Sequence, residues 1–138
     1  MAIAAIDFGR RRIGLAIAYS SISPPLPIGT IERRSTPQDL AEISSRLKAR
    51  DVTLIIVGLP LNMDGTEGPS SRAARSFGVK VGEHLSVPIE FYDERLTSFE
   101  AKDRLIGDGQ KRPGKDKIDA LAATIILEGW LEAHHSLE

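Results

Sequence analysis

Residues 2–18, AIAAIDFGRRRIGLAIA, decide the fold, because two apolar runs flank a short turn that carries an acid, a glycine and three arginines. The runs at residues 2–6 and 13–18 predict two paired strands. Asp7 closes the first run, so it is expected at the end of a strand, beside a turn that carries three arginine side chains. A carboxylate next to arginines suggests metal and phosphate chemistry.

The next segment predicts an edge strand and then a helix. Residues 26–31 are expected to form the strand, and Pro27 places it at an edge because proline cannot donate a hydrogen bond to a ladder. Thr36 is predicted to cap the helix, with Pro37 at its first position. Three antiparallel strands therefore precede the first helix.

The rest of the chain alternates between strands and helices. The apolar run at residues 52–57 predicts a central strand covered on both faces, and residues 89–92 predict a short strand. Helices are predicted from apolar spacing at residues 74–85, from a capping box at 97–100 and from residue 115 to 132. Strands joined by helices run parallel, so the sequence predicts an α/β fold: a mixed five-stranded sheet, three antiparallel strands followed by parallel crossovers, flanked by helices.

Length and composition narrow the classes of function. The 138 residues fit a single domain spanning residues 1–138. No cysteine is present, which excludes a disulfide partner, a thiolate metal site and a cysteine nucleophile. No run approaches the roughly 18 apolar residues of a membrane span, so no membrane partner and a cytoplasmic location are expected. The net charge of −1 argues against a protein that coats nucleic acid by charge alone.

Acidic residues stand where an α/β fold places its functional crevice, at the carboxyl ends of strands. Asp7 ends the first strand, and Asp93 and Glu94 end the strand at residues 89–92. For Asp7 the alternative is an acid that caps the following turn. Alternation along the short strand puts Asp93 and Glu94 on opposite faces, so only one of the two can face the crevice.

Two further acids lie near the start of the last predicted helix. Asp119 shares a helix face with apolar residues such as Ala123 and Ile126, and a buried carboxylate there needs a cation, a hydrogen-bond network or a solvent cleft. The alternative is an exposed first-turn acid stabilised by the helix dipole. Asp116 lies three residues earlier, where an N-cap role is favoured over a ligand role.

Two strand-end acids and a helix-borne acid match the needs of two-metal phosphodiester cleavage. Hard carboxylate oxygens hold two Mg²⁺ or Mn²⁺ ions about 4 Å apart, which activate a water molecule and neutralise the leaving 3′ oxygen. No side-chain nucleophile is needed, so a chain without a usable cysteine or histidine can still be an enzyme.

Four motifs together carry a family resemblance over nearly the whole chain. They read DFGRRRIGLA at residues 7–16, VGLPLNMDGTEG at 57–68, DERLTSFEA at 93–101 and KIDALAATIILEGWL at 117–131. In this order and spacing they resemble the YqgF/RuvX family. The resemblance implies an RNase H-like fold and a nuclease, either one that matures the end of pre-16S ribosomal RNA or a Holliday-junction resolvase.

The resemblance also implies site residues. The acidic triad of the family falls on Asp7, Glu94 and Asp119, and the preference for Glu94 over Asp93 rests mainly on it. The glycines of the first motif fall on Gly9 and Gly14, where they allow close backbone approach, and its basic residue falls on Arg12. The second motif contributes Asn62, Asp64 and Gly65, for which an Asx-type loop turn is the alternative to a catalytic role.

The expected substrate is structured RNA or branched DNA, with Arg12, Lys111, Arg112 and Lys115 holding phosphates beside the acids. Fold and metal site serve either backbone, and a junction resolvase needs a homodimer whereas trimming an RNA end needs only a monomer. A phosphate-binding fragment of a sugar-kinase-like ATPase is a rival, but one lobe of this size leaves a nucleotide cleft without its second wall. A non-catalytic nucleic-acid-binding module is the other rival.

Overall fold

The computed structural model describes residues 1–96 and 115–135, with the side chains of residues 96, 115–119 and 135 left aside. The elements are β1 (Ala2–Phe8), β2 (Arg12–Ala18), β3 (Leu26–Glu32), α1 (Thr36–Lys48), β4 (Val52–Leu59), α2 (Pro69–Leu85), β5 (Ile89–Asp93), the 3₁₀ turn η1 (Glu94–Leu96) and α4 (Lys115–His135). The helix expected to start at the capping box of residues 97–100 lies outside the described residues.

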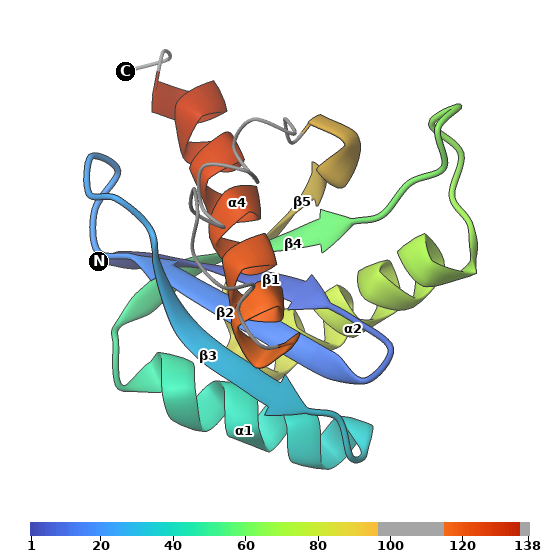
Figure 1. The fold of residues 1–138 in the computed structure, drawn as a ribbon. Coiled ribbons are helices and arrows are strands. Elements are labelled where there is room, and N and C mark those ends of the chain that lie inside the picture. Colours follow the sequence, from blue (N-terminus) through green and yellow to red (C-terminus); the bar gives the residue numbers. More distant parts are fainter. Residues whose placement is uncertain (97–114, 136–138) are drawn as a thin grey trace.

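The five strands form one mixed sheet in the order β3-β2-β1-β4-β5 (Figure 1). β1 pairs antiparallel with β2, and β2 pairs antiparallel with β3. β4 pairs parallel with β1 and with β5. The predicted α/β fold, with antiparallel hairpins followed by parallel crossovers, is therefore confirmed.

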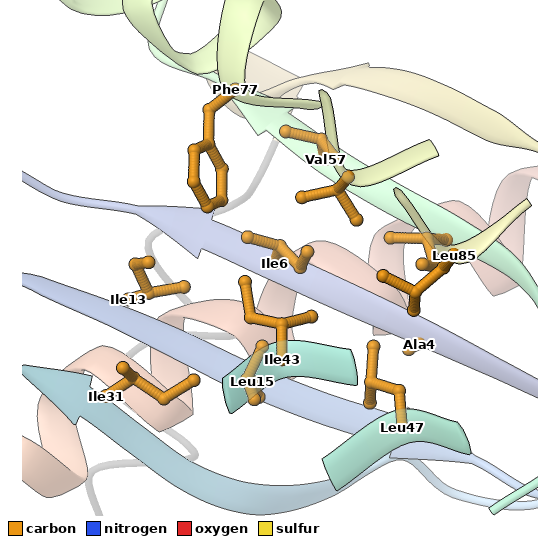
Figure 2. Packing of buried hydrophobic residues seen from close by; sticks show 12 residues of the cluster. Ala4, Ile6, Ile13, Leu15, Ile31, Ile43, Leu47, Val57, Phe77 and Leu85 are labelled. Atoms are coloured by element: carbon orange, nitrogen blue, oxygen red, sulfur yellow. The ribbon is translucent and has the colours of Figure 1, made fainter. Parts of the chain in front are cut away.

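The sheet separates two apolar layers because its side chains alternate between faces. On one face, Ala4 and Ile6 pack with residues of α1 and α2, as Figure 2 shows. On the other face, Ala5 packs with α4, whose Ile126 and Leu127 are buried. Asp7 follows Ala5 by two residues, so alternation places it on the α4 face.

Helix α1 begins with a different cap from the one predicted. Ser35, not Thr36, is the N-cap, and its hydroxyl accepts a hydrogen bond from the Gln38 backbone N–H at 3.3 Å. The Gln38 side chain also accepts a hydrogen bond from that hydroxyl at 3.0 Å. Ser35 and Gln38 have the spacing of a capping box, and this pairing outweighs the preference that Pro37 suggested for Thr36.

Glycines in α2 let the helix lie close to the edge strand β5. A Cβ added at Gly78 would lie 2.7 Å from the Phe91 ring, and one added at Gly82 would lie 2.6 Å from Ile89 Cγ1. The low helix propensity of glycine is thus offset by close packing against β5. Among the described helices, none is both long and apolar enough to cross a membrane.

Candidate active site

Asp7 lies near the carboxyl end of β1, between two strands that present glycine. Its partner across the β1–β2 ladder is Gly14. On the other side, Gly58 follows Val57, the β4 residue that pairs with Ile6. Neither of these glycines places a side chain of its own beside the partly buried Asp7.

Glu94 reaches the same region from β5. It is the first residue of η1, and a Cβ added at Gly58 would lie 3.0 Å from its Cγ and from its carboxyl carbon. The same Cβ would lie 2.6 Å from Cδ1 of Ile126 on α4. Glu94 therefore packs over Gly58, on the face of the sheet that α4 covers.

Both carboxylates line one open groove with a volume of about 620 Å³. Its lining residues are Asp7, Phe8, Gly9, Arg10, Arg33, Pro60, Pro69, Ser70, Ala73 and Glu94. Acids that are 87 positions apart by their residue numbers (94 − 7) thus share one solvent-accessible space. Such a pair of hard oxygen donors suits Mg²⁺ or Mn²⁺.

The turn between β1 and β2 is tight, and Gly9 is part of the reason. The Gly9 N–H donates to the Arg12 carbonyl at 2.9 Å, and a Cβ at Gly9 would lie 2.7 Å from that carbonyl oxygen. The obstruction is backbone, so a larger residue would have to open the turn. This agrees with the close backbone approach expected from the first motif.

The predicted helix-borne acids lie only partly within the described structure. Asp116 and Asp119 are in the first turns of α4, and Asp119 precedes the buried Ala123 by one helical turn. Their side chains are outside the described part, as is that of Lys115, and Lys111 and Arg112 are outside it altogether. Among the side chains that are described, no three acids or histidines meet as a metal site.

Asp93 is not among the described residues that line the groove, and its carboxylate binds Arg95. Its carboxylate accepts hydrogen bonds from the Arg95 backbone N–H at 2.9 Å and from Nη2 at 2.7 Å. The side-chain hydrogen bonds from Arg95, and then the one from its backbone N–H, hold the pKa of Asp93 below its usual range. Arg95 Nη1 also donates to the Met63 carbonyl at 3.2 Å, so the pair ties the loop after β4 to the end of β5.

That loop is closed by its own polar groups. Asp64 accepts hydrogen bonds from the Thr66 backbone N–H at 3.0 Å and from its hydroxyl at 2.6 Å, and these bonds lower the pKa of Asp64. Asn62 donates to the Thr66 hydroxyl at 3.0 Å. Asp64 therefore makes an Asx-type turn, the alternative that the sequence left open, and Asn62 binds the same threonine through its side-chain amide. Neither residue is among those that line the groove.

The contacts of Asp93 predict a mild phenotype for its substitution. Asp93→Asn should slow cleavage by no more than about tenfold, because it weakens a partly exposed ion pair rather than removing a groove carboxylate. Hydrogen exchange at Gly65 and Thr66 should quicken. Folding lowers the pKa of Asp93. The stabilisation from the Asp93–Arg95 pair is therefore fully present above the ordinary pKa of aspartate and is lost as the pH falls through the lowered value. A loss of activity as deep as that of Asp7→Asn would instead make Asp93 a ligand.

Two arginines of the groove were not among the predicted binding residues. Arg10 is exposed at the tip of the β1–β2 turn, and Arg33 follows β3. The sequence offered one signal, the adjacent arginines Arg33 and Arg34 directly after the predicted edge strand. Arg12, the predicted phosphate contact, is partly buried on β2 and is not among the residues that line the groove.

Comparison with known structures defines the class of fold. The structure of Thermus thermophilus RuvC in complex with a Holliday junction substrate matches with a TM-score of 0.65 at 14% sequence identity, over 96% of each chain. The fold is therefore RNase H-like, as the resemblance implied.

Sequence comparison defines the family. The RuvX family, described as Holliday junction resolvase, matches residues 1–133, and the chain belongs to this family. A relative from Anaeromyxobacter dehalogenans strain 2CP-1, named "Putative pre-16S rRNA nuclease", is 48% identical over 92% of this chain and 93% of its own. A relative with the same name from Crocosphaera subtropica is 41% identical over 92% of this chain and 90% of its own.

Proposed function

We propose that this protein is a metal-dependent endonuclease that cleaves structured RNA, with the end of precursor 16S ribosomal RNA as its substrate. The observation that carries the proposal is the shared groove of Asp7 and Glu94, which come from two strands far apart in the sequence. The names of the curated relatives support the choice of RNA. Residues 1–138 act as one nuclease domain, and the place of work is the cytoplasm, where ribosomes assemble.

The residues present fit a divalent cation. Asp7 and Glu94 supply carboxylate oxygens, and both residues line the open groove of about 620 Å³. Asp119, at the start of the helix that packs on this face, is the proposed third ligand. When bound, two Mg²⁺ or Mn²⁺ ions would supply Lewis-acid activation of water and stabilise the charge that develops on the leaving oxygen.

The chain's own residues hold the cations and the substrate. Gly58 allows Glu94 to lie over β4. The tight turn at Gly9 follows Asp7 closely and is held by the hydrogen bond from the Gly9 N–H to the Arg12 carbonyl. Positive charge from Arg12, Lys111, Arg112 and Lys115 is proposed to hold phosphates around the acids, so affinity should fall steeply with salt.

The experiment compares two substrates for the wild-type protein. One is an RNA that spans the boundary between mature 16S ribosomal RNA and its precursor extension, and the other is a four-way DNA junction. Each is incubated with Mg²⁺, with Mn²⁺ and with EDTA. We expect metal-dependent cleavage of the RNA, no cleavage in EDTA, and a monomeric protein.

Other outcomes separate the alternatives. Paired, symmetric cuts in the junction by a dimer would favour the resolvase that the family description names. Binding of both substrates with cleavage of neither would favour a non-catalytic module. Cleavage that persists in EDTA would contradict the metal-dependent reaction.

A further inference from the structure

Arg33 is held in one place by contacts with residues that are distant in sequence. Its guanidinium carbon lies 4.3 Å from the centroid of the Phe8 ring, which stacks on Phe77 of α2 at 4.4 Å. Its Nη1 donates long hydrogen bonds to the Gly9 and Arg10 carbonyls, at 3.5 and 3.4 Å. The stack and these bonds fix a guanidinium against the turn that follows Asp7, at little further entropy cost on binding.

The groove joins this guanidinium to the carboxylates across the end of the sheet. Asp7 and Glu94 lie on the face covered by α4, whereas Phe8 packs with the α1 and α2 layer and carries Arg33 with it. Arg10 lies at the tip of the turn between them. One surface therefore has two acids at one end, Arg33 at the other end and Arg10 at the turn between them.

The opposite wall adds no carboxylate to the basic end. It is the first turn of α2, with Pro69, Ser70 and Ala73 in the groove lining. The N-cap of this helix is Gly68, which has no side chain to cap the first N–H groups. The wall is thus neutral in side-chain charge, and the positive end of a helix dipole lines the same groove as the two arginines.

A purely structural role for Arg33 is the competing explanation. Its Nε lies 3.8 Å from Oδ2 of the buried Asp39, a distance at which the two groups form an ion pair without a hydrogen bond. Asp39 instead accepts a hydrogen bond from the Arg34 backbone N–H at 3.0 Å. Arg33 also keeps about a third of its side chain exposed, at 31%. Pairing with Asp39 explains the position of Arg33 Nε. It does not explain why Arg33 also lines the groove.

We propose that Arg33 and Arg10 form a binding site for a backbone phosphate of the substrate, next to the phosphate that is cleaved at Asp7 and Glu94. This proposal rests on the proposed nuclease function. It implies that the nucleic-acid strand of the substrate crosses the carboxyl end of β1, from the α4 face of the sheet to the α2 face. Guanidinium groups suit phosphate because their planar donors match its oxygens.

The test measures binding and its salt dependence for Arg33→Gln, Arg33→Lys and Arg10→Gln, with Arg34→Gln as the matched control. The control removes the same charge one residue away, from a side chain that is exposed and outside the groove. Fluorescence anisotropy with the labelled precursor RNA in EDTA gives the Kd between 50 and 200 mM salt. Melting temperatures show whether each variant is folded.

Arg33→Gln and Arg10→Gln should each weaken binding about tenfold and reduce the salt slope by about 0.7 to 0.9, the value of one phosphate contact. Arg33→Lys should keep most of the slope, and Arg34→Gln should match the wild type. If Arg33→Gln does not fold, the exposed Arg10 decides the outcome alone.

Unchanged slopes for Arg33→Gln and Arg10→Gln, in a wild-type background that binds and cleaves the RNA, would overturn the phosphate site and leave the nuclease function standing. Failure of the wild type to bind either the RNA or the DNA junction would instead remove the proposed function, and the phosphate site with it. An equal loss of affinity and salt slope in Arg34→Gln would show that only the net charge of the protein matters, and would overturn the phosphate site.

Discussion

Asp7→Asn is expected to slow cleavage of the precursor RNA by on the order of 10³-fold or more, because it removes a negative charge where a divalent cation is proposed to bind. Binding of the RNA should stay the same or tighten slightly, since the substitution removes repulsion from phosphate. The measurement is single-turnover cleavage in Mg²⁺ together with the Kd in EDTA. Stability should change little, because the substitution is isosteric.

Asp51→Asn is the matched control for Asp7→Asn. Asp51 is an exposed acid at the opposite end of the sheet, where its carboxylate pairs with the N-terminal amine at 3.3 Å and its carbonyl accepts from the Ala2 N–H. Its φ of 53° lies in the left-handed region, which asparagine tolerates well. The control should cleave at the wild-type rate. Equal activity of Asp7→Asn and Asp51→Asn would contradict a catalytic role for Asp7.

Gly58→Ala is expected to impair the site by displacing Glu94. The added methyl group would lie 2.6 Å from Ile126 Cδ1 and 3.0 Å from the carboxyl carbon of Glu94, so one or both must move. Overpacking of this kind costs about 1–3 kcal/mol of the free energy of unfolding. A shift of the carboxylate by about 1 Å can cost on the order of 100-fold in rate. Chemical denaturation and cleavage assays measure the two effects separately.

Gly78→Ala separates misplacement of the carboxylate from loss of stability. Its methyl group would meet the Phe91 ring at 2.7 Å, which is a comparable clash on the other face of the sheet and away from the groove. The two variants should therefore lose similar stability, and only Gly58→Ala should lose activity at a temperature where both are folded. Similar activities would contradict the expectation that Gly58→Ala displaces Glu94 from its catalytic position.

Much of the fold could be predicted from local patterns. The glycine-bearing turn between two apolar runs fixes the β1–β2 hairpin, and the apolar run that became β4 is covered on both faces, as its lack of alternation indicated. The cap of α1 was predicted one residue too late because the Ser35–Gln38 pairing was overlooked beside the proline signal. Helix starts depend on such short-range competition between side chains.

The candidate site was predictable where it follows from strand ends. Asp7 and Glu94 meet because the carboxyl ends of parallel strands share one edge of the sheet. Arg33 was not predictable in this way, because it lies over the ring of Phe8, which in turn stacks on Phe77, and the three residues are distant from one another in sequence. The role of Asp93 likewise depends on Arg95 and on the Met63 carbonyl across the sheet edge.

Carboxylates at the ends of separate strands are proposed to hold divalent cations in one groove, and anomalous diffraction from crystals of the wild-type protein grown with Mn²⁺ locates such cations. Manganese peaks are expected within coordination distance of both Asp7 and Glu94, about 2.0–2.3 Å from their oxygens, and no such peaks in Asp7→Asn crystals. Manganese bound elsewhere, with the Asp7–Glu94 groove empty in an enzyme that cleaves RNA under the same conditions, would contradict this proposal.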